Sequence, residues 1–163
     1  MKENQKGFGI VVILIMIMLV LLFGVGWYVY SRYKSTHVSY QEVSSHPEAT
    51  LIYPGSKIVG KRGSSQEPIE TFGNKNPAHA GIDAVTSETT QQIYDFYHQW
   101  MIAHGWTPYD IGRTSGQLST QGYQRGTRES FGVAIDDPTW HKTIASKYPG
   151  KTFYETLYIL SPP

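Results

Sequence analysis

The chain of 163 residues contains no cysteine, which excludes disulfide bonds and thiolate zinc sites. Charged side chains are also sparse, at 17% of the sequence, and after residue 36 twelve Asp or Glu stand against ten Lys or Arg. A nucleic-acid-binding protein needs a basic surface to contact the phosphates. This faintly acidic balance therefore argues against nucleic acid as a partner.

Recognisable catalytic and cofactor motifs are missing as well. The sequence has no G-x-S-x-G elbow, no P-loop and no dinucleotide-binding fingerprint. Its six histidines lack the spacing of a helical zinc site, and they are His37, His46, His79, His98, His104 and His141. The sequence therefore predicts no enzyme class, no cofactor and no metal site.

A long apolar run is present near the N-terminus, over residues 8–30, and it carries no charged side chain. About 23 residues at roughly 1.5 Å each span the hydrocarbon core of a bilayer as a helix. The run is longer than the apolar part of a cleavable signal peptide, and it ends in Trp27, Tyr28 and Tyr30, which suit the membrane interface. We predict a retained transmembrane helix over 8–30, with residues 1–7 in the cytoplasm and the C-terminal part outside.

Lys6, Gly7 and Phe8 stand directly before or at the start of this run. This junction resembles the cleavage site of type IV prepilins, where a peptidase cuts after the glycine. The resemblance implies a pilin-like subunit of a surface filament or secretion system. The sequence departs from that family at Val12, where a glutamate is usual, and the helical pattern ends by residue 39 instead of continuing as a long amphipathic helix.

The rest of the chain divides into a linker and one domain. Residues 31–48 are polar and aperiodic, which predicts a linker, and 49–163 is long enough for a single domain with a core. Pro54-Gly55 predicts a turn, and the stretch 60–79, rich in Gly, Ser, Asn and Pro, predicts a long loop. Strands are predicted over 80–86, 106–111, 117–124, 131–135 and 151–160.

The clearest predicted element is an amphipathic helix over 88–104. Apolar residues recur there at intervals of three and four, Ser87 is the expected N-cap, and Gly105 is the expected C-terminal cap. Antiparallel strands with one such helix predict an α+β fold, with the helix packed across one face of the sheet in two layers.

Two short motifs accompany this pattern. Tyr53-Pro54-Gly55 precedes the first strands, and Phe96-Tyr97 lies in the helix that ends before Gly105-Trp106. The arrangement resembles a loose group of small, membrane-tethered bacterial α+β domains of unassigned role. The resemblance implies a fold and transfers no active site.

The best catalytic candidates are Asp136, Asp137 and His141. Two carboxylates beside an imidazole can bind a cation or serve as base and acid, which would suit an envelope enzyme. The competing interpretation is ordinary turn chemistry, because Asp136-Asp137-Pro138 follows a predicted strand.

Tyrosines supply a second candidate surface. In the strand over 151–160 we expect Phe153, Leu157 and Ile159 to face the core, and Tyr154 and Tyr158 to face away from it. With three further tyrosines, Tyr94, Tyr109 and Tyr123, they are candidates for an exposed stripe that binds a partner.

These observations favour a single-pass membrane protein that displays a small, non-catalytic domain outside the cytoplasm, for binding or for envelope architecture. Its expected partners are the lipid bilayer, through residues 8–30, and an envelope protein or glycan. The alternatives are the pilin-like subunit and the envelope enzyme. The sequence leaves the ligand and the oligomeric state open.

Overall fold

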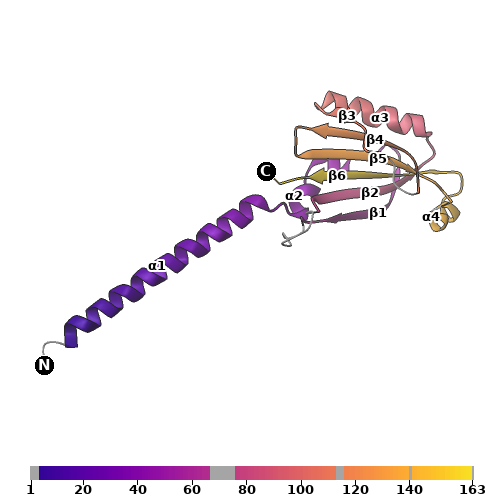
Figure 1. Ribbon diagram of the computed structural model, residues 1–163. Helices are drawn as coiled ribbons and strands as arrows, with labels where there is room; N and C mark the ends of the chain where they lie inside the picture. Colours follow the sequence, from indigo (N-terminus) through magenta and orange to yellow (C-terminus); the bar gives the residue numbers. More distant parts are fainter. Residues whose placement is uncertain (1–3, 67–75, 113–115, 140, 163) are drawn as a thin grey trace. The chain divides into compact units, whose positions relative to one another are not determined.

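The computed structural model describes residues 4–66, 76–112, 116–139 and 141–162, in two compact units, Met1–His37 and Val38–Pro163. The first unit is the helix α1, Asn4–Thr36 (Figure 1). Within it, the span Val12–Ser31 is long and apolar enough to cross a membrane and is exposed along its whole length; a signal sequence near the N-terminus would meet the same criteria.

The second unit is built on a six-stranded antiparallel sheet with the strand order β1-β2-β6-β5-β4-β3 (Figure 1). The α+β class and the antiparallel sheet that we predicted are therefore confirmed. The strands are β1, Lys57–Ser64; β2, Ala78–Thr86; β3, Thr107–Tyr109; β4, Gln117–Arg125; β5, Glu129–Asp136; and β6, Thr152–Leu160. Part of the predicted loop 60–79 is thus the second half of β1, and residues 67–75 of that loop lie outside the described residues.

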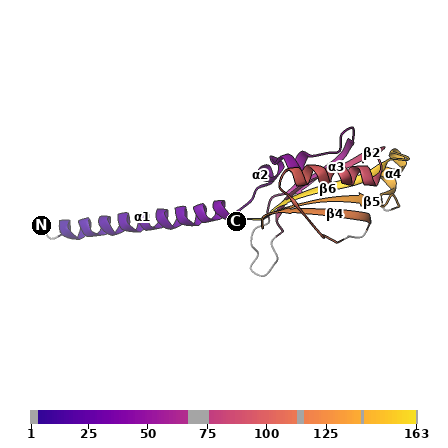
Figure 2. The same cartoon turned by 90° about the horizontal axis from the view of Figure 1, so that it is seen from above.

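The predicted amphipathic helix is α3, Thr90–Ala103. It begins two residues later than predicted, because the N-cap is Thr89 and not Ser87: Thr89 and Gln92 form a capping box. Ile93, Tyr97 and Met101 recur every four residues on its buried face, and Gly105 ends the helix with φ +79°. Figure 2 shows α3 lying along one side of the sheet, with α2, Tyr40–Ser44, on the same side.

The linker predicted over 31–48 is wrong. α1 continues to Thr36, and the core of the domain begins at once with Val38, followed by Val43 in α2 and Ala49 in a 3₁₀ helix, η1, Pro47–Thr50. This segment looked like a linker because its apolar residues are few and widely spaced. Val38, Val43 and Ala49 are nevertheless buried. They belong to the same hydrophobic cluster as the residues on the face of the sheet that α3 covers.

A set of polar and aromatic residues, partly or fully buried, fixes this entry segment to the sheet. We call it the Glu48 network, and it comprises Glu48, Trp106, Arg125, Glu129 and Tyr158. Glu48 is only 1% exposed, accepts a hydrogen bond from the Trp106 indole at 3.3 Å, and lies 3.0 Å from Arg125. The Arg125 guanidinium stacks over Trp106 at 4.6 Å from the ring centre and donates twice to Glu129, which also accepts from Tyr158. Four elements, η1, β4, β5 and β6, and the connection between α3 and β3 are therefore held by one charge network.

The side-chain orientation predicted for β6 is also wrong, because the positions predicted to face the core and those predicted to face away from it are exchanged. Tyr154 and Tyr158 are fully buried on the face that is covered by α3, α2 and η1, whereas Leu157 and Ile159 lie partly exposed on the opposite face. Both sets of alternate positions in this strand contain large apolar or aromatic residues, so the pattern alone does not identify the inner face. The tyrosines can be buried because their hydroxyls have partners: Tyr154 donates to Ser56, and Tyr158 donates to Glu129.

We predict that Glu48→Ala destabilises the protein by about 3 kcal/mol, because it breaks a buried ion pair and removes the acceptor of the Trp106 indole. Thermal unfolding of the full-length protein in detergent, followed by near-UV circular dichroism, measures the loss. Glu42→Ala is the matched control, since Glu42 is an exposed glutamate of the same segment, and its effect should stay within about 0.5 kcal/mol. Equal effects would contradict the role assigned to Glu48.

Candidate functional site

A second set of charged residues lies on the face of the sheet opposite α3. We call it the acidic cluster: Arg62 of β1, Asp83 of β2, Glu155 of β6, Asp136 at the end of β5, and His141, which follows β5. The register explains why they meet. Asp83 pairs with Glu155, Glu155 pairs with Ala134, and Asp136 is two residues beyond Ala134 on the same face.

Arg62 is the central cation of the acidic cluster. Its guanidinium donates two hydrogen bonds to Glu155, at 2.9 and 2.7 Å, in the bidentate geometry that suits a carboxylate. Its Nη1 also lies 2.8 Å from Asp83 Oδ1, without the alignment of a hydrogen bond. The hydrogen bonds to Glu155 raise the pKa of Arg62, so this residue stays charged. Arg62 thus compensates Glu155 fully and Asp83 in part.

Asp136 is left without a strong partner. The residue is 4% exposed, its Oδ1 lies 3.7 Å from His141 Nε2, and its Oδ2 is buried without a hydrogen-bond partner. Burial is the main cause that raises the pKa of Asp136 to about 7, and the neighbouring charge of Glu155 acts in the same direction. Burial likewise raises the pKa of Asp83. The cluster therefore carries more negative charge than its one arginine balances.

His141 closes the cluster from outside the sheet. It precedes the short helix α4, Lys142–Lys147, and its ring packs edge-on against Phe153, with 4.9 Å between the ring centres. The side chain is 34% exposed, so its imidazole is accessible to solvent while Nε2 points to Asp136. His141 therefore connects the buried carboxylate of Asp136 to the solvent-exposed surface.

The structure brings together two of the three predicted catalytic candidates and separates the third. Asp136 and His141 approach each other, whereas Asp137 is partly exposed and accepts a hydrogen bond from the backbone N–H of Thr139. That hydrogen bond lowers the pKa of Asp137 and is ordinary turn chemistry. The turn interpretation thus holds for Asp137 and not for Asp136.

Sequence reasoning missed Asp83, Glu155 and Arg62. The first two are single carboxylates inside otherwise apolar strands, and that pattern was the available signal. The proposed tyrosine stripe is wrong: Tyr94, Tyr123, Tyr154 and Tyr158 are buried. The fifth tyrosine of the proposed stripe, Tyr109, is partly exposed and lies on the face of the sheet opposite α3.

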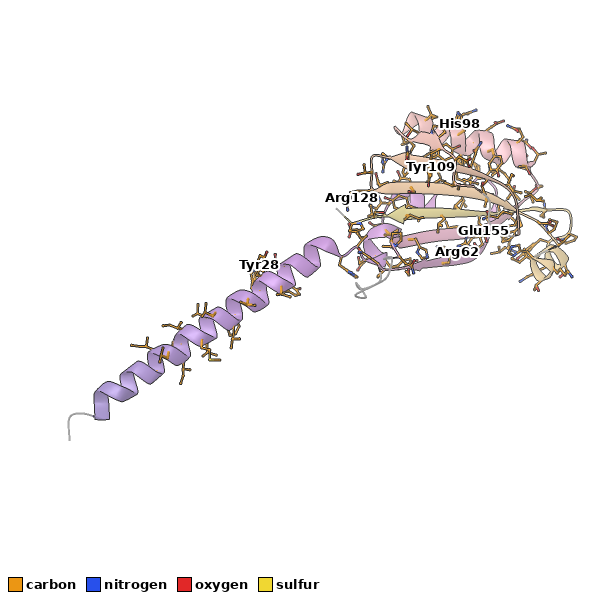
Figure 3. All side chains as sticks on the ribbon, viewed as in Figure 1. Tyr28, Arg62, His98, Tyr109, Arg128 and Glu155 are labelled. Carbon is orange, nitrogen blue, oxygen red and sulfur yellow. The ribbon has the colours of Figure 1, made fainter. Side chains whose placement is uncertain are left out.

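A groove of about 240 Å³ lies beside the acidic cluster. Its lining includes Leu157 and Ile159 of β6, Tyr109 and Ile111, and Arg62 and Glu155. Figure 3 shows Tyr109 on the β3 side of the sheet and Arg62 and Glu155 on the opposite side. The groove is thus mainly apolar and has a charged end.

In comparisons with known proteins, no family model, no curated protein and no solved structure matches this chain. The similarity to small membrane-tethered domains and to prepilin junctions therefore stays a prediction.

The raised pKa of Asp136 gives a test of the acidic cluster. A carboxyl whose pKa is about 7 in the folded protein and 3.8 in the unfolded chain favours folding when protonated. This contribution is complete below pH 4 and is lost as the pH rises through 7. In EDTA, Asp136→Asn should therefore gain stability over the natural protein on going from pH 5.5 to pH 8.5, by on the order of 2 kcal/mol.

Thermal or urea unfolding at the two pH values measures this gain. Asp137→Asn is the control: Asp137 is partly exposed and its pKa is lowered, so its effect should be the same at both pH values. A pH-independent effect of Asp136→Asn would contradict the burial of an uncompensated carboxyl.

Proposed function

We propose that the protein is a single-pass membrane protein that displays the domain from Val38 onward outside the cytoplasm, for binding and not for catalysis. The observation that carries the proposal is the exposed apolar span Val12–Ser31, followed within a few residues by a separately folded unit. Trp27, Tyr28 and Tyr30 at the end of this span support a retained anchor, because aromatic side chains favour the membrane interface.

The geometry of the domain supports a binding role through the face opposite α3. The other face is filled by the aromatic core beneath α3, α2 and η1, whereas this face carries the groove and the acidic cluster. A non-catalytic role is supported by the position of Asp137, since one of the three candidate acid–base groups turns out to belong to a surface turn. An envelope protein or glycan is the expected partner class.

The pilin-like alternative receives less support from the fold. The amphipathic helix that packs on the sheet is α3, from the middle of the chain. A pilin would instead use a continuation of its N-terminal helix for this purpose.

The absence of cysteine allows a clean test of topology. Thr127→Cys places one thiol in the exposed turn between β4 and β5, and Glu3→Cys places one before the apolar run. In intact cells, a membrane-impermeant maleimide should label Thr127→Cys and should label Glu3→Cys only after lysis. Alkaline extraction should leave both variants in the membrane fraction. The opposite labelling pattern, or release by alkali, would overturn the proposal.

Intact mass measurement of the membrane-extracted protein separates the anchor from the pilin-like alternative. We expect a mass that includes residues 2–7. A mature N-terminus at Phe8, particularly a methylated one, would instead support the prepilin resemblance, and a start beyond residue 30 would show a cleaved signal sequence.

A further inference from the structure

Three potential metal ligands converge in the acidic cluster. One ligand atom each from Asp136, His141 and Glu155 can be chosen so that all three lie within 4.8 Å of one another. The residues come from the end of β5, the segment before α4, and the middle of β6, so the folded domain, and not a local sequence motif, assembles them.

The second observation is the buried oxygen of Asp136. The Oδ2 atom is buried and has no hydrogen-bond partner, in a residue that is only 4% exposed. Burying a carboxylate oxygen away from solvent without a protein donor costs free energy unless a cation or a proton is supplied. Arg62 does not supply it, because its guanidinium is occupied by Glu155 and Asp83.

From this arrangement we propose that Asp136, His141 and Glu155 form a binding site for a divalent transition-metal ion, with Zn²⁺ as the representative. Zinc prefers imidazole nitrogen and carboxylate oxygen at about 2.0–2.2 Å, and in open sites it takes three protein ligands and one water. The corresponding ligand-to-ligand distance is about 3.3 Å, close to the 3.7 Å between His141 Nε2 and Asp136 Oδ1.

The donor set favours this class of ion over Ca²⁺ and Mg²⁺. Calcium takes six to eight oxygen ligands and magnesium takes an octahedron of oxygens, whereas imidazole suits zinc and its neighbours. His141 is partly exposed, which gives the ion a path from solvent and an open position for a water or an external ligand. An external ligand at that position would lie close to Glu155, which also lines the groove.

Arg62 has a supporting role in this site. It donates to both oxygens of Glu155 and so fixes the orientation of that carboxylate, while each oxygen keeps a second lone pair for the ion. Such outer partners orient metal ligands in known sites. The proposed metal site does not involve the membrane anchor. If the protein bound no Zn²⁺, the proposal of a membrane-anchored binding domain would therefore still stand.

Isothermal titration of ZnCl₂ into the full-length protein tests the proposal. The protein is purified in detergent without a histidine tag, stripped with EDTA and dialysed. We expect saturation at one Zn²⁺ per chain, and Asp136→Asn and His141→Ala should each raise the Kd about tenfold or more. Asp136→Asn is expected to fold well, because it removes a buried charge, and circular dichroism of each variant verifies the fold.

Two matched controls distinguish this site from adventitious zinc binding. His98→Ala removes an exposed histidine of α3, and Asp137→Asn removes the partly exposed carboxylate beside Asp136; neither should change the Kd. The proposal is overturned if the natural protein binds no Zn²⁺, if Asp136→Asn and His141→Ala bind as the natural protein does, or if His98→Ala weakens binding as much as His141→Ala.

Discussion

The ion pair between Glu48 and Arg125 is the interaction on which the architecture of the domain depends. A carboxylate that is 1% exposed needs a close cation and a donor, and Arg125 and the Trp106 indole supply both to Oε1, whereas the buried Oε2 has no hydrogen bond within the described residues and lies 4.0 Å from His46 Nδ1. Together with the Trp106 indole, the pair joins η1 to the end of β4 and to the connection between α3 and β3. Because Glu129 and Tyr158 join the same network, the entry segment becomes part of the core and the domain begins directly after α1.

β5 links this network to the acidic cluster, since it begins with Glu129 and ends with Asp136. The two ends face opposite sides of the sheet and differ in their charge balance. At Glu129, hydrogen bonds from Arg125 and Tyr158 lower the pKa, so the ionised form is favoured. At Asp136, burial and Glu155 act in the other direction. The hydrogen-bonded Glu129 stabilises the fold. The buried Asp136 is unfavourable for stability, and such placements of titratable groups are concentrated at functional sites.

The features that the sequence predicts best depend on local periodicity. α3, its glycine cap and most strands follow from residues that are close together in the chain. The features that it misses depend on partners far away in the sequence: Tyr158 can be buried because Glu129 accepts a hydrogen bond from its hydroxyl, and Glu48 can be buried because Arg125 forms an ion pair with it. Asp136 and His141 were candidates because they are near neighbours in sequence, whereas Glu155 joins them through strand pairing alone.

The groove beside the acidic cluster follows from the same reversed alternation of β6. Because Tyr154 and Tyr158 are buried on the face covered by α3, α2 and η1, the opposite face presents Leu157. This residue is flanked by Gly81 on β2 and by Gly132 on β5. The next strand contributes Gly122, where an added Cβ would lie 2.7 Å from the carbonyl oxygen of Tyr109 and 2.5 Å from Ile111. The carbonyl oxygen of Tyr109 and the side chain of Ile111 therefore leave no room for a side chain at position 122. The glycine at this position keeps the groove open. A mainly apolar groove with one charged end follows, and a ligand held there would lie against Glu155.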